Sequence, residues 1–95
     1  MRFNPLLDVK VEIGYRGHAV TGVAHRRPSG MFSASVEVRD LQHRRGGVFF
    51  ERDFQDEFPH ADSAIDAALR EGHQVIEARL DTLEEEAKSK LTEAV

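Results

Sequence analysis

Apolar and polar residues alternate along the first half of the chain with the regularity of β-strands. The alternation is clearest over residues 7–13 and 31–39, weaker over 18–26, and short over 48–52. Because successive side chains of a strand point to opposite faces, a period of two predicts strands with one apolar face. Glycine and proline in the intervening segments are typical of turns.

From about residue 62 the period changes to that of a helix, with apolar residues recurring every three or four positions. Asp62 or Ser63 is expected to cap the start of this helix. Gly72 interrupts the stripe, and a glycine inside a helix costs about 1 kcal/mol relative to alanine. We therefore expect a close helix–sheet contact at Gly72. The stripe consists of Ile65, Ala68, Leu69, Gly72, Val75, Ile76, Arg79, Leu80 and Leu83.

The order of these elements predicts an α+β fold, in which a three- to four-stranded antiparallel sheet is followed by one long C-terminal helix packed on one face. The 95 residues fit a single domain. The sheet is expected over about residues 7–52, a connector over 53–61 and the helix over about 62–92. The predicted core consists of Phe32, Val36, Val38, Phe50, Ile65, Leu69, Val75, Ile76 and Leu80.

The predicted helix is longer than the sheet that it covers. A helix of about 30 residues spans ~45 Å, whereas a strand of about six residues spans ~20 Å. The apolar stripe nevertheless continues through Leu83, Ala87 and Leu91. An isolated helical tail of that length is marginally stable in water, so it either frays in solvent or packs on a second copy of the chain. We expect these three residues to mediate self-association as a homodimer.

Charge is distributed unevenly around the net value of −4. Residues 1–52 contain nine Lys and Arg against five Asp and Glu, and residues 53–95 contain four against twelve. Two expected loops carry arginine pairs, and a basic sheet face between them would suit phosphate contacts. A weaker hypothesis is therefore a nucleic-acid site made by Arg26, Arg27, Arg44 and Arg45.

Several functional classes find no support in the residues. The chain has no cysteine, which removes disulfides and thiolate chemistry, and no apolar run approaches the ~20 residues of a membrane span. We expect a cytoplasmic protein. No nucleophile elbow, phosphate-binding loop or histidine pair of metalloenzyme type occurs, so neither an enzyme nor a cofactor is expected.

The acidic segment before the helix contains residue types that bind metal ions. Its spacing matches no known cation-binding loop, so we expect a solvated loop and no metal. The residues concerned are Asp53, Asp56, Glu57, His60 and Asp62.

Several short segments resemble small proteobacterial βββα proteins of unknown function. This resemblance covers about residues 15–80 and implies a stand-alone sheet-plus-helix domain, but no activity or site residues. The segments are Tyr15-Arg16-Gly17-His18, Gly30-Met31-Phe32, Gly47-Val48-Phe49 and the series Ala64, Ala68, Gly72, Ile76.

The start of the predicted helix, residues 62–68, more loosely resembles the HicB-type antitoxin domain, which has a partial RNase H-like fold. Residues 58–61 read Phe-Pro-His-Ala and depart from the Pro-Gly-Cys-like segment of that pattern.

The sequence as a whole favours a small non-enzymatic protein-interaction module that self-associates. A nucleic-acid-binding or antitoxin-like regulatory domain is the alternative, and an enzyme or enzyme accessory protein comes third.

Overall fold

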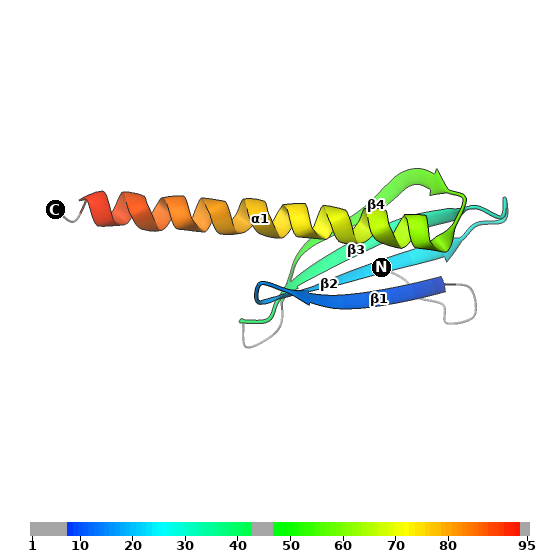
Figure 1. Ribbon diagram of the computed structural model, residues 1–95, viewed down its shortest axis with the longest axis horizontal. Helices are drawn as coiled ribbons and strands as arrows, with labels where there is room; N and C mark the ends of the chain where they lie inside the picture. The colour runs from blue at the N-terminus through cyan, green and yellow to red at the C-terminus, as the bar shows by residue number, and fades with distance from the viewer. Residues whose placement is uncertain (1–7, 43–46, 94–95) are drawn as a thin grey trace.

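A computed structural model describes residues 8–42 and 47–93 of the chain. This part forms four strands followed by one helix (Figure 1). The strands pair into one antiparallel sheet, and the helix packs against it, which confirms the expected α+β class. The elements are β1 (Asp8–Tyr15), β2 (His18–Arg26), β3 (Phe32–Asp40), β4 (Val48–Phe58) and α1 (Ala61–Glu93).

The strands lie in the sheet in chain order, each antiparallel to the next. A two-residue turn joins β1 to β2, with φ values of 48° at Arg16 and 80° at Gly17. Positive φ at both central positions is the type I′ turn, whose twist matches that of the strands it connects. Tyr15 and His18 therefore lie opposite each other across this turn.

β4 is longer than the predicted strand, because it continues past Arg52 to Phe58. Most of the expected connector over 53–61 is thus part of the sheet, and only Pro59 and His60 separate β4 from α1.

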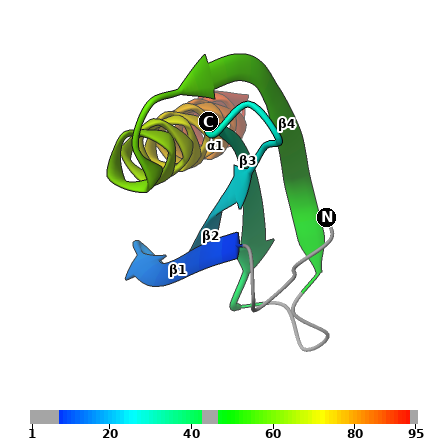
Figure 2. The same cartoon turned by 90° about the vertical axis from the view of Figure 1, so that its right-hand side faces the viewer.

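Irregular pairing explains why the end of β4 escaped prediction. Ser33 pairs with Glu57 but Ser35 pairs with Asp53, so three residues of β4 lie opposite Ala34. Such a bulge interrupts the period of two and bends the strand. Figure 2 shows β4 curving over α1.

α1 lies on the concave face of the curved sheet, mainly over β2 and β3 (Figure 2). Two glycines permit this approach. A Cβ atom at Gly72 would stand 2.4 Å from Cγ1 of Val20, and one at Gly22 would stand 3.2 Å from Cβ of Ala68. The close contact expected at Gly72 is therefore confirmed.

The helix begins one residue earlier than predicted, at Ala61. The backbone N–H of Ala64 donates to the carbonyl oxygen of His60 at 3.2 Å, which makes His60 the residue that flanks the first turn. Asp62 and Ser63 lie inside that turn instead of capping it. There the Asp62 carboxylate interacts favourably with the positive end of the helix dipole.

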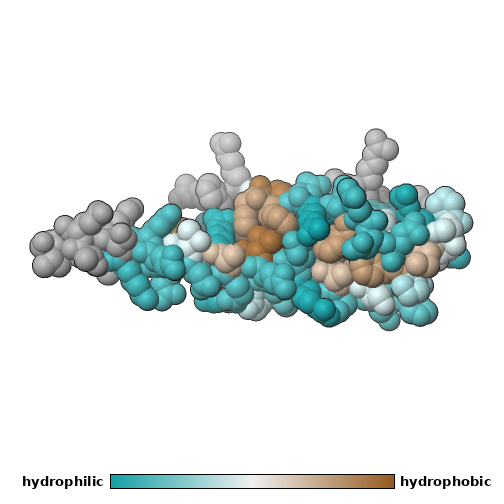
Figure 3. All heavy atoms as spheres, turned by 90° about the horizontal axis from the view of Figure 1, so that it is seen from above, coloured by the Kyte–Doolittle hydropathy of each residue, from teal (hydrophilic) through white to brown (hydrophobic). Residues whose placement is uncertain are grey.

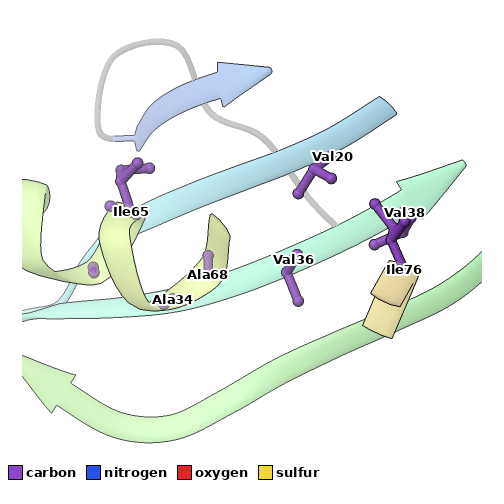
Figure 4. Packing of buried hydrophobic residues seen from close by; sticks show 9 residues of the cluster. Val20, Ala34, Val36, Val38, Ile65, Ala68 and Ile76 are labelled. Carbon is purple, nitrogen blue, oxygen red and sulfur yellow. The ribbon is translucent and has the colours of Figure 1, made fainter. Parts of the chain in front are cut away.

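The core agrees in part with the prediction. Of the nine predicted residues, four are buried (Val36, Val38, Ile65, Ile76), four are partly buried against them (Phe32, Phe50, Leu69, Leu80), and the half-buried Val75 lies outside the cluster. Small residues contribute more than expected, and Figure 4 shows Ala34 and Ala68 between the larger side chains. The additional buried apolar residues are Ala19, Val20, Val23, Ala24, Ala34, Ala64 and Ala68.

The helix extends well beyond the sheet (Figure 1). Its 33 residues dominate the shape of the molecule, which measures 61 × 25 × 16 Å along its principal axes. Leu80 is the last helical residue that packs against the core, and residues 81–88 are all exposed. We call residues 81–93 the overhang.

Candidate functional site

Two of the four arginines predicted to contact nucleic acid, Arg26 and Arg27, lie in the described part of the structure. Arg26 and Arg27 lie at the tip of the β2–β3 hairpin, where they and Pro28 and Gly30 line an open pocket of about 340 Å³. Arg44 and Arg45 lie outside the described residues. β3 ends at Asp40, at the opposite end of the sheet from Arg26.

The described residues of the convex face do not form the basic stripe expected between these loops. Arg39, which lies near the end of β3 on this face, already has acidic partners, because it donates to Glu12 at 2.7 Å and lies 3.9 Å from Glu37. Among the strand residues of this face, acidic residues outnumber basic ones; the titratable side chains are those of Asp8, Lys10, Glu12, His25, Glu37, Arg39, Glu51, Asp53 and Glu57.

The predicted acidic segment is spread along β4 and into α1. Asp53, Asp56 and Glu57 are exposed on the strand, and His60 and Asp62 flank the start of the helix. Within residues 8–42 and 47–93, no group of three or more His, Asp or Glu side chains is arranged to hold a metal ion.

A hydrogen-bonded series on the convex face was not foreseen. His25 Nδ1 lies 3.0 Å from Asp8 Oδ2, and His25 Nε2 lies 3.0 Å from Ser35 Oγ. Carboxylate, imidazole and hydroxyl in this order resemble the relay of serine hydrolases. Ser35 is only 1% exposed, however, so a substrate carbonyl has no access to its oxygen. We therefore interpret the series as a structural link between β1, β2 and β3.

No sequence pattern distinguished Asp8, His25 and Ser35 from the other polar residues of the strands. Asp8, His25 and Ser35 are far apart along the chain, and each is an ordinary polar residue on a strand. Only the strand register brings them together, since β2 pairs with β1 on one side and with β3 on the other.

A polar cluster ties the β1–β2 turn to the helix. The Tyr15 hydroxyl and the Arg16 guanidinium both donate to the Glu77 carboxylate, the second over 2.8 Å, and the Tyr15 ring stacks on His73 at 4.3 Å. These donors, first Tyr15 and then Arg16, hold the pKa of Glu77 below its ordinary value of 4.5. The hydrogen bond to Glu77 raises the pKa of Tyr15 above 10.0.

A second cluster lies on the other side of the helix. The Arg79 guanidinium sits 4.1 Å from the centre of the Phe49 ring and donates to Asp40 at 3.0 Å. Phe49 in turn makes an edge contact with His18. The one polar member of the predicted stripe is thus a link from the helix to β3 and β4. Together the two clusters fix the helix where it leaves the sheet.

Exposed apolar side chains gather at this same end of the sheet. Leu83 is 48% exposed one turn beyond Arg79. Phe49 and Val48 on β4 and Leu41 in the loop after β3 are exposed as well. Figure 3 shows apolar surface near the middle of the long axis and hydrophilic surface toward the free end of the helix.

Of the residues predicted to self-associate, Leu83 and Ala87 are exposed on the overhang as expected. The backbone of Leu91 continues the helix, but its side chain lies outside the described part. In the described residues, no helix is both long and apolar enough to cross a membrane.

Comparisons of the sequence with family models and curated proteins, and of the fold with solved structures, found no match.

Proposed function

We propose that this protein is a cytoplasmic, non-enzymatic protein-interaction module whose binding element is the overhang of α1, with a second copy of the chain as its partner. The observation that carries the proposal is that the helix continues for three turns past the sheet while Leu83 and Ala87 of its apolar stripe are exposed. Leu80 packs on the core, whereas Leu83, the next member of the stripe, is 48% exposed.

The energetics of a free helix favour a partner. The overhang has no sheet beneath it, and an isolated helix of about a dozen residues is marginally stable in water. Packing Leu83 and Leu91 against a second helix would bury apolar surface and stabilise the tail. The steps of three and four between Leu80, Leu83 and Ala87 suit an interhelical contact.

Charge favours an antiparallel arrangement of the two overhangs. Residues 84–86 are three consecutive glutamates, and lysines follow at 88 and 90. Within one chain Lys88 lies 3.6 Å from Glu84. An antiparallel partner would place its lysines beside the glutamates, whereas a parallel partner would align like charges.

Sedimentation velocity at about 50 µM tests this proposal, because that concentration populates a dimer of micromolar dissociation constant. Leu83→Glu and Leu91→Glu are each expected to lower the average sedimentation coefficient below that of wild type, because each removes association through the overhang. Thr82→Glu is the matched control, because it adds the same charge on the overhang next to the stripe. A wild type that sediments as a monomer, or a Thr82→Glu variant that dissociates equally, contradicts the proposal.

The nucleic-acid alternative has one observation in its favour. Arg26 and Arg27 are both exposed at the hairpin tip, with neither side chain in an ion pair among the described residues. The acidic residues of the adjoining convex face repel phosphate, so this alternative stays second.

A further inference from the structure

The two edges of the sheet are built differently. β4, at one edge, has two register shifts and exposed acidic residues, and both features discourage pairing with another strand. β1, at the other edge, pairs with β2 through all eight of its residues without a shift. Among the described residues β1 has a strand neighbour on one side only. A straight edge strand without proline is a template for a further strand.

The concave side of β1 is incompletely covered. α1 lies mainly over β2 and β3, so Val9 is 44% exposed while Val11 and Ile13 are half-buried against the core. These three residues occupy alternate positions and form an apolar ledge along the edge of the sheet. A strand placed beside β1 would cover this ledge with its own side chains.

The turn between β1 and β2 determines which backbone groups point outward. In a two-residue hairpin the residues that flank the turn, Tyr15 and His18, direct their backbone groups toward each other. This orientation alternates along an antiparallel strand. The even-numbered residues of β1, from Gly14 back to Asp8, therefore direct their N–H and C=O groups toward the outer edge.

One register makes β1 complementary to itself. With a twofold axis through Val11, Lys10 of each copy lies opposite Glu12 of the other, and Val9 lies opposite Ile13. All directly opposed charges are then of opposite sign, and all opposed residues of the ledge are apolar, which are the stabilising cross-strand pairs. Arg39 already holds the Glu12 carboxylate at 2.7 Å, on the face where Lys10 of the other copy would lie.

The neighbouring registers lack this complementarity. An axis through Lys10 would place the two Lys10 side chains opposite each other and Asp8 opposite Glu12. An axis through Glu12 would oppose the two Glu12 carboxylates. Like charges directly opposite each other destabilise a strand pair. Charge thus selects the register centred on Val11.

We infer that β1 pairs antiparallel with β1 of a second copy in the register centred on Val11, joining two four-stranded sheets into one continuous sheet. The twofold axis runs perpendicular to the sheet, so both helices lie on the same face and the two overhangs point in opposite directions. This surface is separate from the overhang and does not depend on the function proposed for it.

A pair of charge variants tests the register. In the Lys10→Glu variant, a carboxylate at residue 10 of one copy faces the Glu12 carboxylate of the other copy. In the Glu12→Lys variant, the Lys10 amine of one copy faces an amine at residue 12 of the other. Each single variant is expected to raise the apparent dissociation constant at least tenfold over wild type. Mixing the two restores opposite-sign pairs, so the mixture is expected to associate as wild type does. Circular dichroism melts verify that both variants are folded.

Cysteine substitution locates the axis, because the chain contains no other cysteine. Val11→Cys is expected to form a disulfide-linked dimer under mild oxidation at about 100 µM, a concentration suited to a weak interface, since two copies of residue 11 face each other. Val9→Cys is the control, because residue 9 would face residue 13.

Both experiments are repeated in the Leu83→Glu background, where association through β1 is expected to persist even if the overhang no longer binds. Equal crosslinking at residues 9 and 11, failure of the charge-variant mixture to associate, or absence of association through β1 at about 100 µM each overturns the inference. If no association through β1 is found, the outer edge of β1 does not pair with a second copy of the chain.

Discussion

Gly72 of α1 lies directly against Val20 of β2, with the position of a Cβ atom at residue 72 only 2.4 Å from Val20 Cγ1. Val20 is fully buried, and its strand is the one on which the helix mainly packs. This contact sets how closely the helix approaches the sheet. It also explains why a glycine occurs inside a long helix, where alanine has the higher intrinsic propensity.

Gly72→Ala is expected to destabilise the protein by roughly 1–2 kcal/mol. Alanine contributes up to about 1 kcal/mol through helix propensity, but forcing a methyl group into a packed core costs about 1–3 kcal/mol. Urea denaturation measures the difference. Gly14→Ala is the control, because a Cβ atom at residue 14 meets nothing within 4 Å.

The double variant Gly72→Ala with Val20→Ala isolates the contact itself. Removing the Val20 side chain makes room for the new methyl group, so the double variant should be less destabilised than the sum of the two single variants. If the changes in the free energy of unfolding were additive, the Val20 side chain would not be the reason why residue 72 is a glycine.

The Tyr15–Glu77 hydrogen bond is expected to make stability depend on pH at both ends of the scale. The pKa of Glu77 is lowered from 4.5, so its stabilising contribution is complete above pH 4.5 and is lost as the pH falls through the lowered pKa. The pKa of Tyr15 is raised from 10.0, so its contribution is complete below pH 10.0 and is lost as the pH rises through the raised pKa.

Thermal melts of Glu77→Gln measure the acid limb. The variant should be less stable than wild type at about pH 7, and the gap should narrow toward about pH 2, where the wild-type carboxylate is protonated. Glu85→Gln is the control, since it removes an exposed carboxylate on the overhang. Parallel pH profiles for wild type and Glu77→Gln would contradict the assignment.

Ser35→Ala is expected to cost about 1–2 kcal/mol, because it leaves His25 Nε2 without its partner at 3.0 Å on a buried strand. Ser33 occupies the same face of β3 two residues earlier, and Ser33→Ala should change the free energy of unfolding by less than about 0.5 kcal/mol. Chemical denaturation of both variants provides the comparison. If Ser35→Ala and Ser33→Ala destabilised the protein equally, the hydrogen bond between Ser35 and His25 would contribute nothing specific to stability.

Any nucleic-acid affinity is expected to depend on the arginine loops. Alanine at Arg26 and Arg27 should weaken binding to duplex DNA and reduce the slope of log affinity against log salt by about 0.9 for each phosphate that the protein no longer neutralises. Substituting Arg44 and Arg45 as well should abolish the remaining affinity. Arg70→Ala is the control, since Arg70 pairs with Asp66 on the helix. Fluorescence anisotropy with an unchanged slope in the Arg26 and Arg27 variant would place the binding surface elsewhere.

Local pattern was sufficient for the elements and their order. The period of two over β3 and the change to a helical period after residue 60 reflect which faces must be buried, and Val36, Val38, Ile65 and Ile76 follow directly from them. The long overhang also follows from sequence, because the helical stripe continues for more residues than any strand of the sheet can cover.

Local pattern failed where tertiary contacts override the period. β4 was cut short at Arg52 because a bulge opposite Ala34 breaks its alternation. β2 alternates poorly because both of its faces are buried, so apolar and small residues occupy both sets of positions.

What the sequence determined by itself was therefore the choice and order of elements, since burial of one face imposes a period that neighbouring residues display. Only the tertiary structure decided the strand register, the position of the helix over β2 and β3, and the clusters that depend on them. Asp8, His25 and Ser35, or Tyr15 and Glu77, meet because backbone hydrogen bonds align strands and because Gly22 and Gly72 let a helix approach. Contacts between distant residues depend on that alignment, and a one-residue slip of a strand would turn every one of its side chains to the other face.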